Sequence, residues 1–327
     1  MDFLSSTHGL LTVSSCLLPF VAFLAFPRRS RRTSKLSYNK ERVVILGSSS
    51  GIGRSIAVQY ARRGAKVFVF GRRQSQVDEV IKECKAASPR DDGAEGIRGS
   101  AGDFANVDDM VRIRVAVQSE WGGIDTLVVA AGVSALKPLM NVAGVENPKP
   151  GQFQPSHASA ESIQEAADIA NLASHSNYIG PLVAVLTFVS TIHKIPASFL
   201  QPWSFPAAVI PAPTRTIYAS TKAASLVLYQ ALSIEHPDIT FTSVLPSTVE
   251  GDFRASAVDA GPVREANPNK HGLKREDVAA RCILAVDRQE KAVFMPWTMK
   301  IGMLLYWICP SFIEWRARVK YNFNVVS

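Results

Sequence analysis

The sequence predicts an α/β fold in which a doubly wound parallel sheet forms a single domain. Short β-branched runs alternate with stretches of helical periodicity from about residue 42 to residue 295. A strand, a glycine turn, a helix and a second strand follow one another within about 30 residues, as in a βαβ unit. The 327 residues, 47% of them hydrophobic, suit one domain of about 250 residues with extra segments at its ends. Alternating strands and helices imply a parallel sheet with both faces covered.

The first βαβ unit has the clearest signals. Residues 42–46 (RVVIL) form a β-branched run that stops at Gly47. Apolar residues then recur at helical spacing, at Ile52, Ile56, Ala57, Tyr60 and Ala61. Gly64 is a helix stop, and residues 66–70 (KVFVF) predict the second strand.

The same alternation predicts the later elements. Further strands are expected at residues 96–103, 125–130, 239–245 and 292–295. Helices are expected at residues 74–87, 107–121, 161–189, 216–235 and 275–287. Pro181 should disturb the third of these helices, because proline lacks the backbone N–H that a helix interior uses. Residues 134–160 are rich in Pro, Gly and Ser and predict a long loop.

The N-terminal region predicts a membrane anchor. Residues 10–26 are mostly apolar and uncharged, at the lower length limit for a spanning helix. Positive charges follow this run, at Arg28, Arg29, Arg31, Arg32 and Lys35. The positive-inside rule therefore predicts a short lumenal N-terminus (1–9), an anchor in the endoplasmic reticulum (10–26), a basic linker (27–40) and a cytosolic body (41–297). A cleaved targeting peptide is the alternative.

The C-terminal segment, residues 298–327, combines aliphatic residues, aromatic residues and cations. Residues 301–308 read IGMLLYWI, and Trp315 lies among Arg316, Arg318 and Lys320. Eight apolar residues are too few to span a bilayer, but the mixture suits a membrane interface or the mouth of a substrate site. The alternative is a helix that packs on the domain's own core.

Composition excludes several other classes of function. The net charge is +8, but five of the cations lie within residues 28–35, and no basic face with interleaved aromatics recurs, so nucleic-acid binding is not predicted. The four cysteines, Cys16, Cys84, Cys282 and Cys309, have no metal-site or disulfide spacing. No metal site is predicted.

The glycine turn predicts a dinucleotide site. Residues 47–53 (GSSSGIG) lie between the first strand and its helix, where glycines let a pyrophosphate approach the backbone and the helix N-terminus offers free N–H groups. The expected cofactor contacts in this turn are Gly47, Ser49, Ser50, Gly51, Ile52 and Gly53. The turn also contains Gly-x-Ser-x-Gly, so a serine hydrolase with Ser49 as nucleophile is a minor alternative. That motif requires earlier sheet strands, whereas this strand is the first of the body.

The residues after the second strand indicate which cofactor is used. An acidic residue there would bind a ribose 2′-hydroxyl and select NAD. Arg72 and Arg73 stand there instead, and guanidinium groups suit a 2′-phosphate. The sequence therefore predicts NADP(H).

A tyrosine and a lysine predict acid/base chemistry. Tyr218 and Lys222 are four residues apart near the start of an expected helix, so they share one face. A phenol titrates near ~10, and a neighbouring ammonium favours the phenolate and lowers that value. Tyr218 could then donate a proton to a carbonyl oxygen as hydride arrives at carbon.

With these motifs the sequence resembles the short-chain dehydrogenase/reductase family, over residues 41–297, and its layout is closest to the membrane-anchored members. The resemblance implies a Rossmann-like, NADP-binding catalytic domain. It assigns the glycine motif to Gly47, Gly51 and Gly53, the adenine contact to Asp103, and the catalytic pair to Tyr218 and Lys222, with Lys222 also holding the nicotinamide ribose. The family's Asn-x-x-Gly matches Asn177 and Gly180, which assigns a water-mediated proton relay to Asn177.

Some positions depart from the family pattern. The Asn-Asn-Ala-Gly after the fourth strand is Val129-Ala130-Ala131-Gly132, so only Ala131 and Gly132 match. The Pro-Gly after the sixth strand is Pro246-Ser247. The family threonine would fall near Gly251 and Asp252, and Thr248 is the candidate that stands in for it.

The family's catalytic serine, 13 residues before the tyrosine, corresponds to Phe205. Ser204 is adjacent but one position out of register, which would turn its side chain to the other face of a strand. Residues 195–206 also contain Pro196, Pro202 and Pro206, which are poor material for a central strand. A distorted strand that lets Ser204 or Ser190 reach the site and an error in the reading frame are both compatible with this stretch.

Together these features predict an NADP(H)-dependent oxidoreductase that acts on a lipophilic ketone or alcohol, with the membrane as a partner. The catalytic residues would be Tyr218, Lys222, Asn177 and Ser204. The alternative from another class is a catalytically weak NADP(H)-binding scaffold or sensor. The sequence leaves open the substrate, the direction of reaction and whether the protein forms a homo-oligomer.

Overall fold

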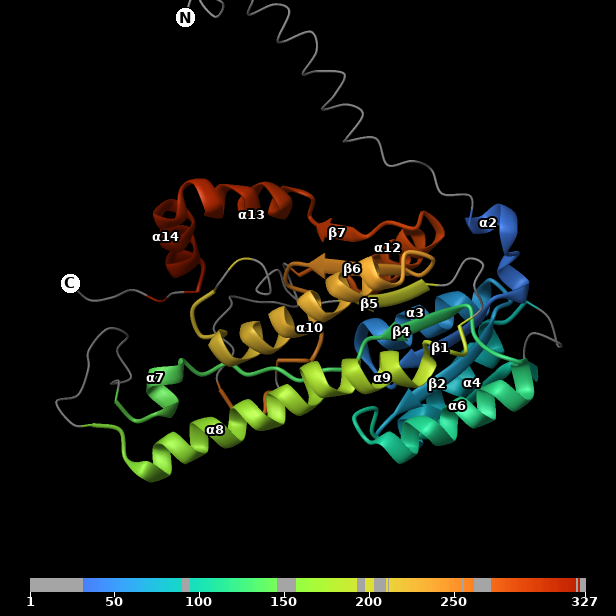
Figure 1. Cartoon of the computed structure of the whole chain (residues 1–327), viewed down its shortest axis with the longest axis horizontal. Coiled ribbons are helices and arrows are strands. Elements are labelled where there is room, and N and C mark those ends of the chain that lie inside the picture. Colours follow the sequence, from blue (N-terminus) through green and yellow to red (C-terminus); the bar gives the residue numbers. More distant parts are fainter. Residues whose placement is uncertain are drawn as a thin grey trace, which may run out of the picture.

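The computed structural model describes residues 32–89, 95–145, 157–192, 198–202, 210, 212–254, 256–261, 272–321 and 323. Within these ranges, seven parallel strands form one sheet in the order β3-β2-β1-β4-β5-β6-β7 (Figure 1). The strands are β1 (Arg42–Leu46), β2 (Lys66–Gly71), β3 (Ile97–Ala101), β4 (Thr126–Val129), β5 (Ser198–Pro202), β6 (Thr240–Pro246) and β7 (Ala292–Met295). The order reverses between β1 and β4, which opens a crevice at the carboxyl ends of the strands.

Helices cover both faces of the sheet. One face packs against α3 (Gly51–Arg62), α4 (Gln74–Ala87) and α12 (Arg275–Asp287). The other packs against α6 (Val107–Trp121), α9 (Gly180–Phe188) and α10 (Thr216–Glu235). Side chains of β1 alternate between the two cores, with Val43 and Ile45 on the α3 side and Val44 and Leu46 on the α6 side. The predicted doubly wound parallel sheet in a single domain is confirmed.

The helix expected at residues 161–189 is interrupted by one π-helical turn between two α-helical segments. It consists of α8 (Ala160–Ser174), a π-helical segment η2 (His175–Ile179) and then α9. Pro181 cannot donate to the carbonyl of Asn177, and that carbonyl instead accepts a hydrogen bond from the Ser225 hydroxyl on α10. The proline therefore changes the local helix type without ending the helix.

The stretch 195–206, whose prolines are poor material for a central strand, contains a central strand of the sheet. β5 pairs in parallel with β4 and with β6. Pro202 is its last residue and lies opposite Val244 of β6, beyond Leu200, where the pairing with β4 ends. A proline at a strand end removes no bond from the middle of the ladder. Pro196 and Pro206 lie outside the described residues.

The loop expected at residues 134–160 contains a short helix, α7 (Leu139–Val142), and residues 146–156 lie outside the described part. The expected anchor at residues 10–26 also lies outside it. Among the helices that are described, none combines the length and the apolar character needed to cross a bilayer.

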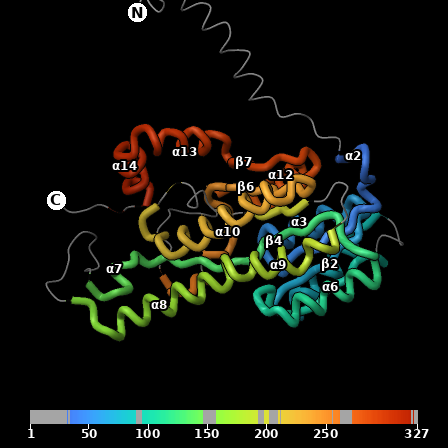
Figure 2. The backbone as a smooth tube through the Cα atoms, viewed as in Figure 1, coloured from blue at the N-terminus to red at the C-terminus, as the bar shows by residue number. Residues whose placement is uncertain are grey.

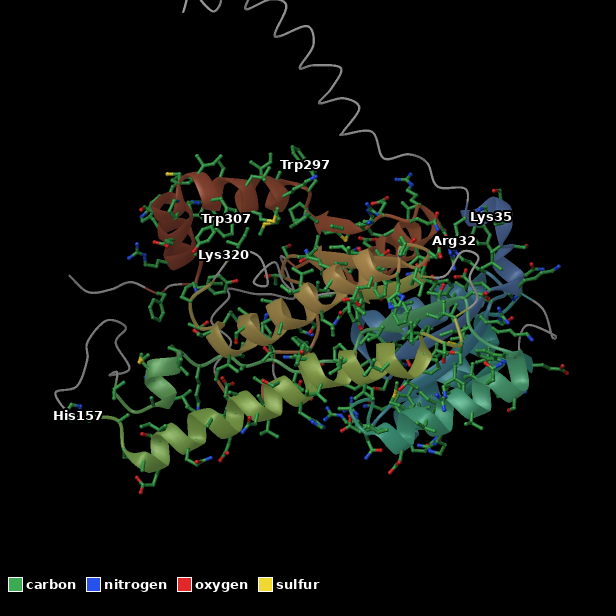
Figure 3. The ribbon with its side chains drawn as sticks, in the orientation of Figure 1. Arg32, Lys35, His157, Trp297, Trp307 and Lys320 are labelled. Atoms are coloured by element: carbon green, nitrogen blue, oxygen red, sulfur yellow. The ribbon has the colours of Figure 1, made fainter. Side chains whose placement is uncertain are left out.

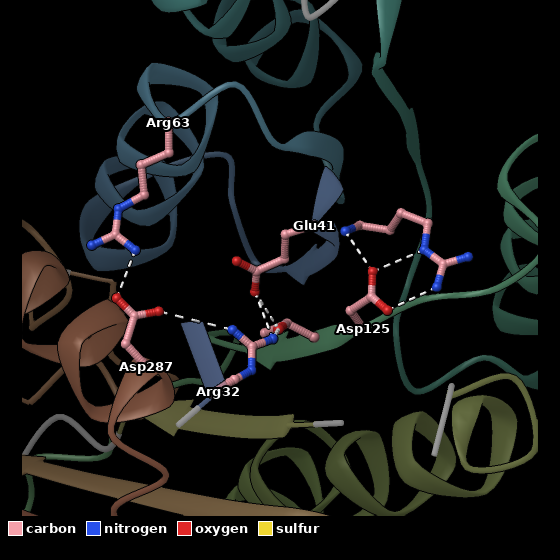
Figure 4. A network of polar contacts seen from close by, with 7 residues as sticks. Arg32, Glu41, Arg63, Asp125 and Asp287 are labelled. Atoms are coloured by element: carbon pink, nitrogen blue, oxygen red, sulfur yellow. Dashed lines mark hydrogen bonds and ion pairs between the residues drawn. The ribbon is translucent and has the colours of Figure 1, made fainter. Parts of the chain in front are cut away.

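The basic linker expected at residues 27–40 is in part built into the domain. It contains α2 (Arg32–Lys35) and η1 (Tyr38–Lys40). The Arg32 side chain is buried, and its Nη2 lies 2.8 Å from Glu41 Oε1 and 2.7 Å from Thr126 Oγ1 (Figure 4). Asp287 of α12 lies 3.8 Å from Arg32 Nη1 and 2.8 Å from Arg63 Nη1. Arg32 is therefore a structural cation rather than one of a solvated surface cluster.

The C-terminal residues form two helices, α13 (Thr298–Ile308) and α14 (Pro310–Lys320), with no buried residue in either. They lie beside β7, at the end of the molecule opposite α2 along the same upper edge (Figures 1 and 2). Tyr321, directly after α14, is buried in the domain, so the segment is attached to the core there, while the two helices themselves stay at the surface.

Candidate active site

The glycine turn forms a cradle at the carboxyl end of β1. The N–H groups of Gly47 and Ser48 donate to the Phe70 carbonyl at 2.9 and 3.0 Å, and the Ser48 hydroxyl accepts from the Phe70 N–H at 2.8 Å. Gly47 has φ +85°, a backbone conformation that favours glycine. A Cβ on Gly47 would collide with Ala131, and one on Gly53 would collide with the Gly47 carbonyl. This tight turn fits a pyrophosphate, which needs close backbone approach.

The remaining turn residues lead into α3. Ser50 precedes the helix, which begins with Gly51, Ile52 and Gly53. The first turn of α3 carries no acidic residue, so the partial positive charge of the helix N-terminus is not opposed there. Ser49 contacts the end of β2, since a Cβ on Gly71 would lie 3.0 Å from Ser49 Oγ.

The residues expected around the adenosine half lie along the same edge of the sheet. Arg72 and Arg73 directly follow β2 and are exposed. Asp103 follows β3, and its Oδ1 accepts a hydrogen bond from the Ala105 N–H at 3.0 Å. Because the carboxyl ends of parallel strands lie on one side of the sheet, these residues and the glycine turn lie on the same side.

Asn177 joins the helical layer to the segment after β4. Its Oδ1 accepts from the Val133 N–H at 2.9 Å, and its Nδ2 donates to the Val133 carbonyl at 3.0 Å and to Thr221 Oγ1 at 3.1 Å. Asn177 is fully buried. The amide therefore fixes the backbone next to Gly132.

Lys222 reaches the same place from α10. A Cβ on Gly132 would lie 2.7 Å from Lys222 Nζ and 2.8 Å from Asn177 Oδ1, so only glycine leaves room for both side chains. Burial lowers the pKa of Lys222 from 10.5 to about 8, because the ammonium loses its hydration. The ammonium and the asparagine thus share one buried position beside the segment after β4.

Tyr218 lies one helical turn before Lys222, with the centre of its ring 5.9 Å from Lys222 Nζ. The ring is buried and packs edge-on against Phe253, at 6.2 Å between centroids. The surrounding apolar cluster includes Val133, Ala135, Val142, Ile169, Ala173, Ile217 and Tyr321. The structure therefore brings Asn177 and Lys222, two of the predicted catalytic residues, together at Gly132, and places the ring of the third, Tyr218, beside Lys222.

Other predicted positions lie at the margin of the site. Ala131 packs on Gly47, and Pro246 is the last residue of β6. The Thr248 carbonyl accepts a hydrogen bond from the Leu273 N–H at 2.8 Å, which ties the segment after β6 to the segment before α12. Ser204 lies outside the described residues, so its role stays a prediction.

Two buried charged residues near the site were not predicted. Arg215 immediately precedes α10, with its guanidinium 6.0 Å from the centre of the Tyr218 ring and its Nη1 donating to Ser134 Oγ at 3.0 Å. Asp259 accepts from the backbone N–H groups of Leu136 and Lys137 at 2.6 and 2.7 Å. Both residues join the segment after β4 to distant parts of the chain, and no local motif marks them.

This fold, with its candidate site at the carboxyl ends of the parallel strands, is typical of nucleotide-binding α/β oxidoreductases, and comparisons with known proteins agree. Residues 41–260 match the family model described as short chain dehydrogenase. The 11-beta-hydroxysteroid dehydrogenase-like 4A of Arabidopsis thaliana is 30% identical over 247 residues, which are 74% of this chain and 73% of that protein. The 11-beta-hydroxysteroid dehydrogenase A of Sesamum indicum is 26% identical over 288 residues, 85% of this chain and 75% of that protein.

Among solved structures, an alcohol dehydrogenase from the archaeon Thermococcus sibiricus, complexed with 5-hydroxy-NADP, is similar with a TM-score of 0.60. Its identity is 22%, over 78% of this chain and 95% of that chain, and this likeness concerns the fold. The protein belongs to the short-chain dehydrogenase/reductase family of oxidoreductases. The fold of this family binds a nicotinamide cofactor.

Proposed function

We propose that the protein is an NADP(H)-dependent carbonyl reductase or alcohol dehydrogenase that acts on a lipophilic ketone or alcohol. The observation that carries the proposal is that Lys222 and Asn177 meet at Gly132 with the Tyr218 ring beside Lys222, while the preceding residue, Ala131, packs on Gly47 of the glycine turn. These residues offer a proton donor, a cation and a rigid support at one edge of the sheet.

Side chains of the protein would transfer the proton that accompanies hydride transfer. The nicotinamide, when bound, supplies or accepts the hydride. During reduction the Tyr218 hydroxyl would donate its proton to the carbonyl oxygen and become a phenolate, and during oxidation the phenolate would accept the proton of the alcohol and return to the hydroxyl form. The Lys222 ammonium stabilises the phenolate and holds the ribose, while Gly132 keeps this position free of a competing side chain.

The predicted proton relay through Asn177 is part of the proposal. Both Nδ2 hydrogens are engaged with Val133 and Thr221, and the backbone carbonyl accepts from Ser225. A relay water would bind the remaining lone pairs of Asn177 Oδ1 and of its backbone carbonyl oxygen. Because its other polar groups already hold protein partners, Asn177 would act mainly by holding the segment after β4 in place.

The proposed preference for NADP(H) depends on Arg72 and Arg73. Both are exposed at the end of β2, where a ribose substituent would lie, and guanidinium groups form charge-assisted hydrogen bonds with phosphate. Neither has to be withdrawn from a buried contact before it meets a ligand.

The proposed substrate class follows from the side chains around Tyr218. Val133, Ile169 and Phe253 contribute to a cluster that contains this ring. An apolar environment around the proposed reacting group suits a ligand that is itself mostly apolar. Relatives named hydroxysteroid dehydrogenases make a steroid ketone or alcohol one reasonable member of the class.

The proposal is tested by measuring NADPH oxidation with a panel of lipophilic ketones, steroids included. Tyr218→Phe removes the proton donor and should lower kcat by about 10²–10⁴-fold. Tyr306→Phe, on α13, is the matched control and should keep full activity. Full activity of Tyr218→Phe would refute the role of Tyr218, whereas NADPH binding without turnover of any ketone would favour the scaffold or sensor.

A further inference from the structure

Helix α13 carries an apolar stripe that faces solvent. Trp297 precedes the helix, and apolar residues follow at helical spacing, at Ile301, Leu304, Leu305 and Ile308. In a helix that packs on a domain, this spacing would form the buried face. Here the exposed fractions of the five residues lie between 37% and 79%. Trp307, outside the stripe, is 81% exposed (Figure 3).

Helix α14 extends the apolar surface and adds positive charge. Phe312, Trp315 and Val319 are each about half exposed, and the guanidinium of Arg316 lies 5.9 Å from the centre of the Trp315 ring. Between residues 297 and 321 the charged residues are Lys300, Glu314, Arg316, Arg318 and Lys320, four cations against one carboxylate, or +3. Cations interleaved with exposed tryptophans are typical of surfaces that bind the interfacial region of a bilayer.

The α13–α14 pair is attached on the side of the candidate active site. Tyr321, which follows α14, is buried in the same apolar cluster as Tyr218. On α13, a Cβ added to Gly302 would lie 3.5 Å from Ile210, which belongs to the segment that precedes α10. A surface that binds this pair of helices would therefore lie beside the segments that lead to Tyr218.

We propose that α13 and α14 form a docking surface that lies in the plane of an anionic lipid bilayer. Exposed apolar stripes of this size mark interaction surfaces. A second copy of the chain is a poorer occupant, because a symmetric contact would place a net charge of +3 opposite another +3. Anionic headgroups instead complement the cations while the apolar stripe enters the acyl boundary. This inference does not depend on the proposed reaction.

Cys309, between the two helices, supplies a local probe. It is a free and exposed thiol, whereas Cys84 and Cys282 are buried. The full chain with Cys16→Ser is labelled at Cys309 with an environment-sensitive fluorophore and mixed with vesicles of phosphatidylcholine and phosphatidylserine. We expect the emission to shift to the blue. The probe senses only the surroundings of Cys309, so insertion of residues 10–26 alone would not produce this shift.

Variants separate the contributions to the shift. Leu304→Glu with Ile308→Glu should abolish it, and Arg316→Glu with Arg318→Glu should raise the lipid concentration that it requires by about tenfold or more. Ile234→Glu, another exposed apolar residue but on α10, should leave it unchanged. Cofactor binding checks that each variant is folded. An absent shift with vesicles would overturn the proposal, as would a lipid-independent shift that rises with protein concentration, which would identify a second copy.

Discussion

Lys222 is a buried lysine whose two protonation states differ in their effect on stability. Burial lowers its pKa to about 8 from 10.5. Between these values the unfolded chain binds the proton and the folded chain does not, so the free energy of unfolding should increase with pH across this window. Below about pH 8 the folded protein keeps the ammonium in a desolvated position at a cost in stability, and in the proposed function this charge is the one that would stabilise the phenolate of Tyr218.

This argument predicts a pH-dependent effect of Lys222→Met. The difference between 10.5 and about 8 corresponds to about 3 kcal/mol, so the variant should be more stable than the wild type by up to that amount below pH 8. The advantage should shrink as pH rises above 8. Urea unfolding of both proteins below and above this pH checks it, and a difference that does not change with pH would contradict it.

Arg72 predicts the choice of cofactor. Arg72→Asp should weaken NADPH binding by about 10- to 100-fold and leave NADH binding little changed, because a charge-assisted hydrogen bond to phosphate is replaced by repulsion. Arg62→Asp makes the same charge change in the last turn of α3 and should leave both affinities unchanged. Fluorescence titrations with both cofactors measure the effect, and equal losses for NADPH and NADH would refute the assignment.

The α8–η2–α9 helix shows how one element positions the site. Pro181 has no N–H to donate to the Asn177 carbonyl, and the Ser225 hydroxyl of α10 donates to this carbonyl. Tyr229, one turn further along α10, donates to the Pro181 carbonyl at 3.2 Å. The irregular turn thereby fixes α10, which carries Tyr218 and Lys222, against the segment that carries Gly132.

Asn177→Ala should destabilise this connection. The substitution leaves the buried Val133 N–H and carbonyl without their partner, and the free energy of unfolding should fall by about 1–3 kcal/mol. Asn171→Ala, an exposed asparagine on α8, should have little effect. Urea unfolding checks both variants, and equal stability of Asn177→Ala and the wild type would show that the clamp on Val133 contributes nothing.

Across the whole molecule, the two ends of the parallel strands differ. The candidate site lies at the carboxyl ends of the strands, whereas a buried ionic network of Arg32, Glu41 and Asp287 lies at their amino ends (Figure 4). Beside it, the Arg42 side chain donates two hydrogen bonds to Asp125, at 2.8 and 2.7 Å, and the Arg42 backbone N–H donates a third at 2.9 Å. The network joins α2 and the start of β1 to α12, so the N-terminal approach to the domain is fixed on the side away from the chemistry.

Removing the central cation should therefore affect stability and not catalysis. Arg32→Met leaves Glu41 and Asp287 buried with less compensation, and the free energy of unfolding should fall by about 3–5 kcal/mol. Lys35→Met, in the same short helix but exposed, should change it by less than about 0.5 kcal/mol. Thermal unfolding measures both. An unchanged Arg32→Met protein would show that α2 does not support the domain.

Much of the site was predictable because its signals are local. The glycine turn at Gly47 and the Tyr218–Lys222 spacing are readable from a few neighbouring residues. Arg215 and Asp259 escaped prediction because their partners, Ser134 and Leu136, lie 81 and 123 residues away in the sequence. Whether residues 195–206 form a strand stayed open in the sequence, because their prolines disfavour a central strand and nothing local shows that Pro202 falls at the end of the strand, beyond the pairing with β4.

The sequence by itself determined the family, most of the alternating strands and helices, and the glycine, tyrosine and lysine motifs, because periodicity and short-range spacing record these directly. The tertiary structure alone decided that Arg32 is buried, that Asn177 clamps Val133, and that α13 and α14 expose their apolar residues. The reason is physical: burial and hydrogen-bond partners depend on which distant segments meet, and an apolar helix reads the same in sequence whether its stripe faces a core or the solvent.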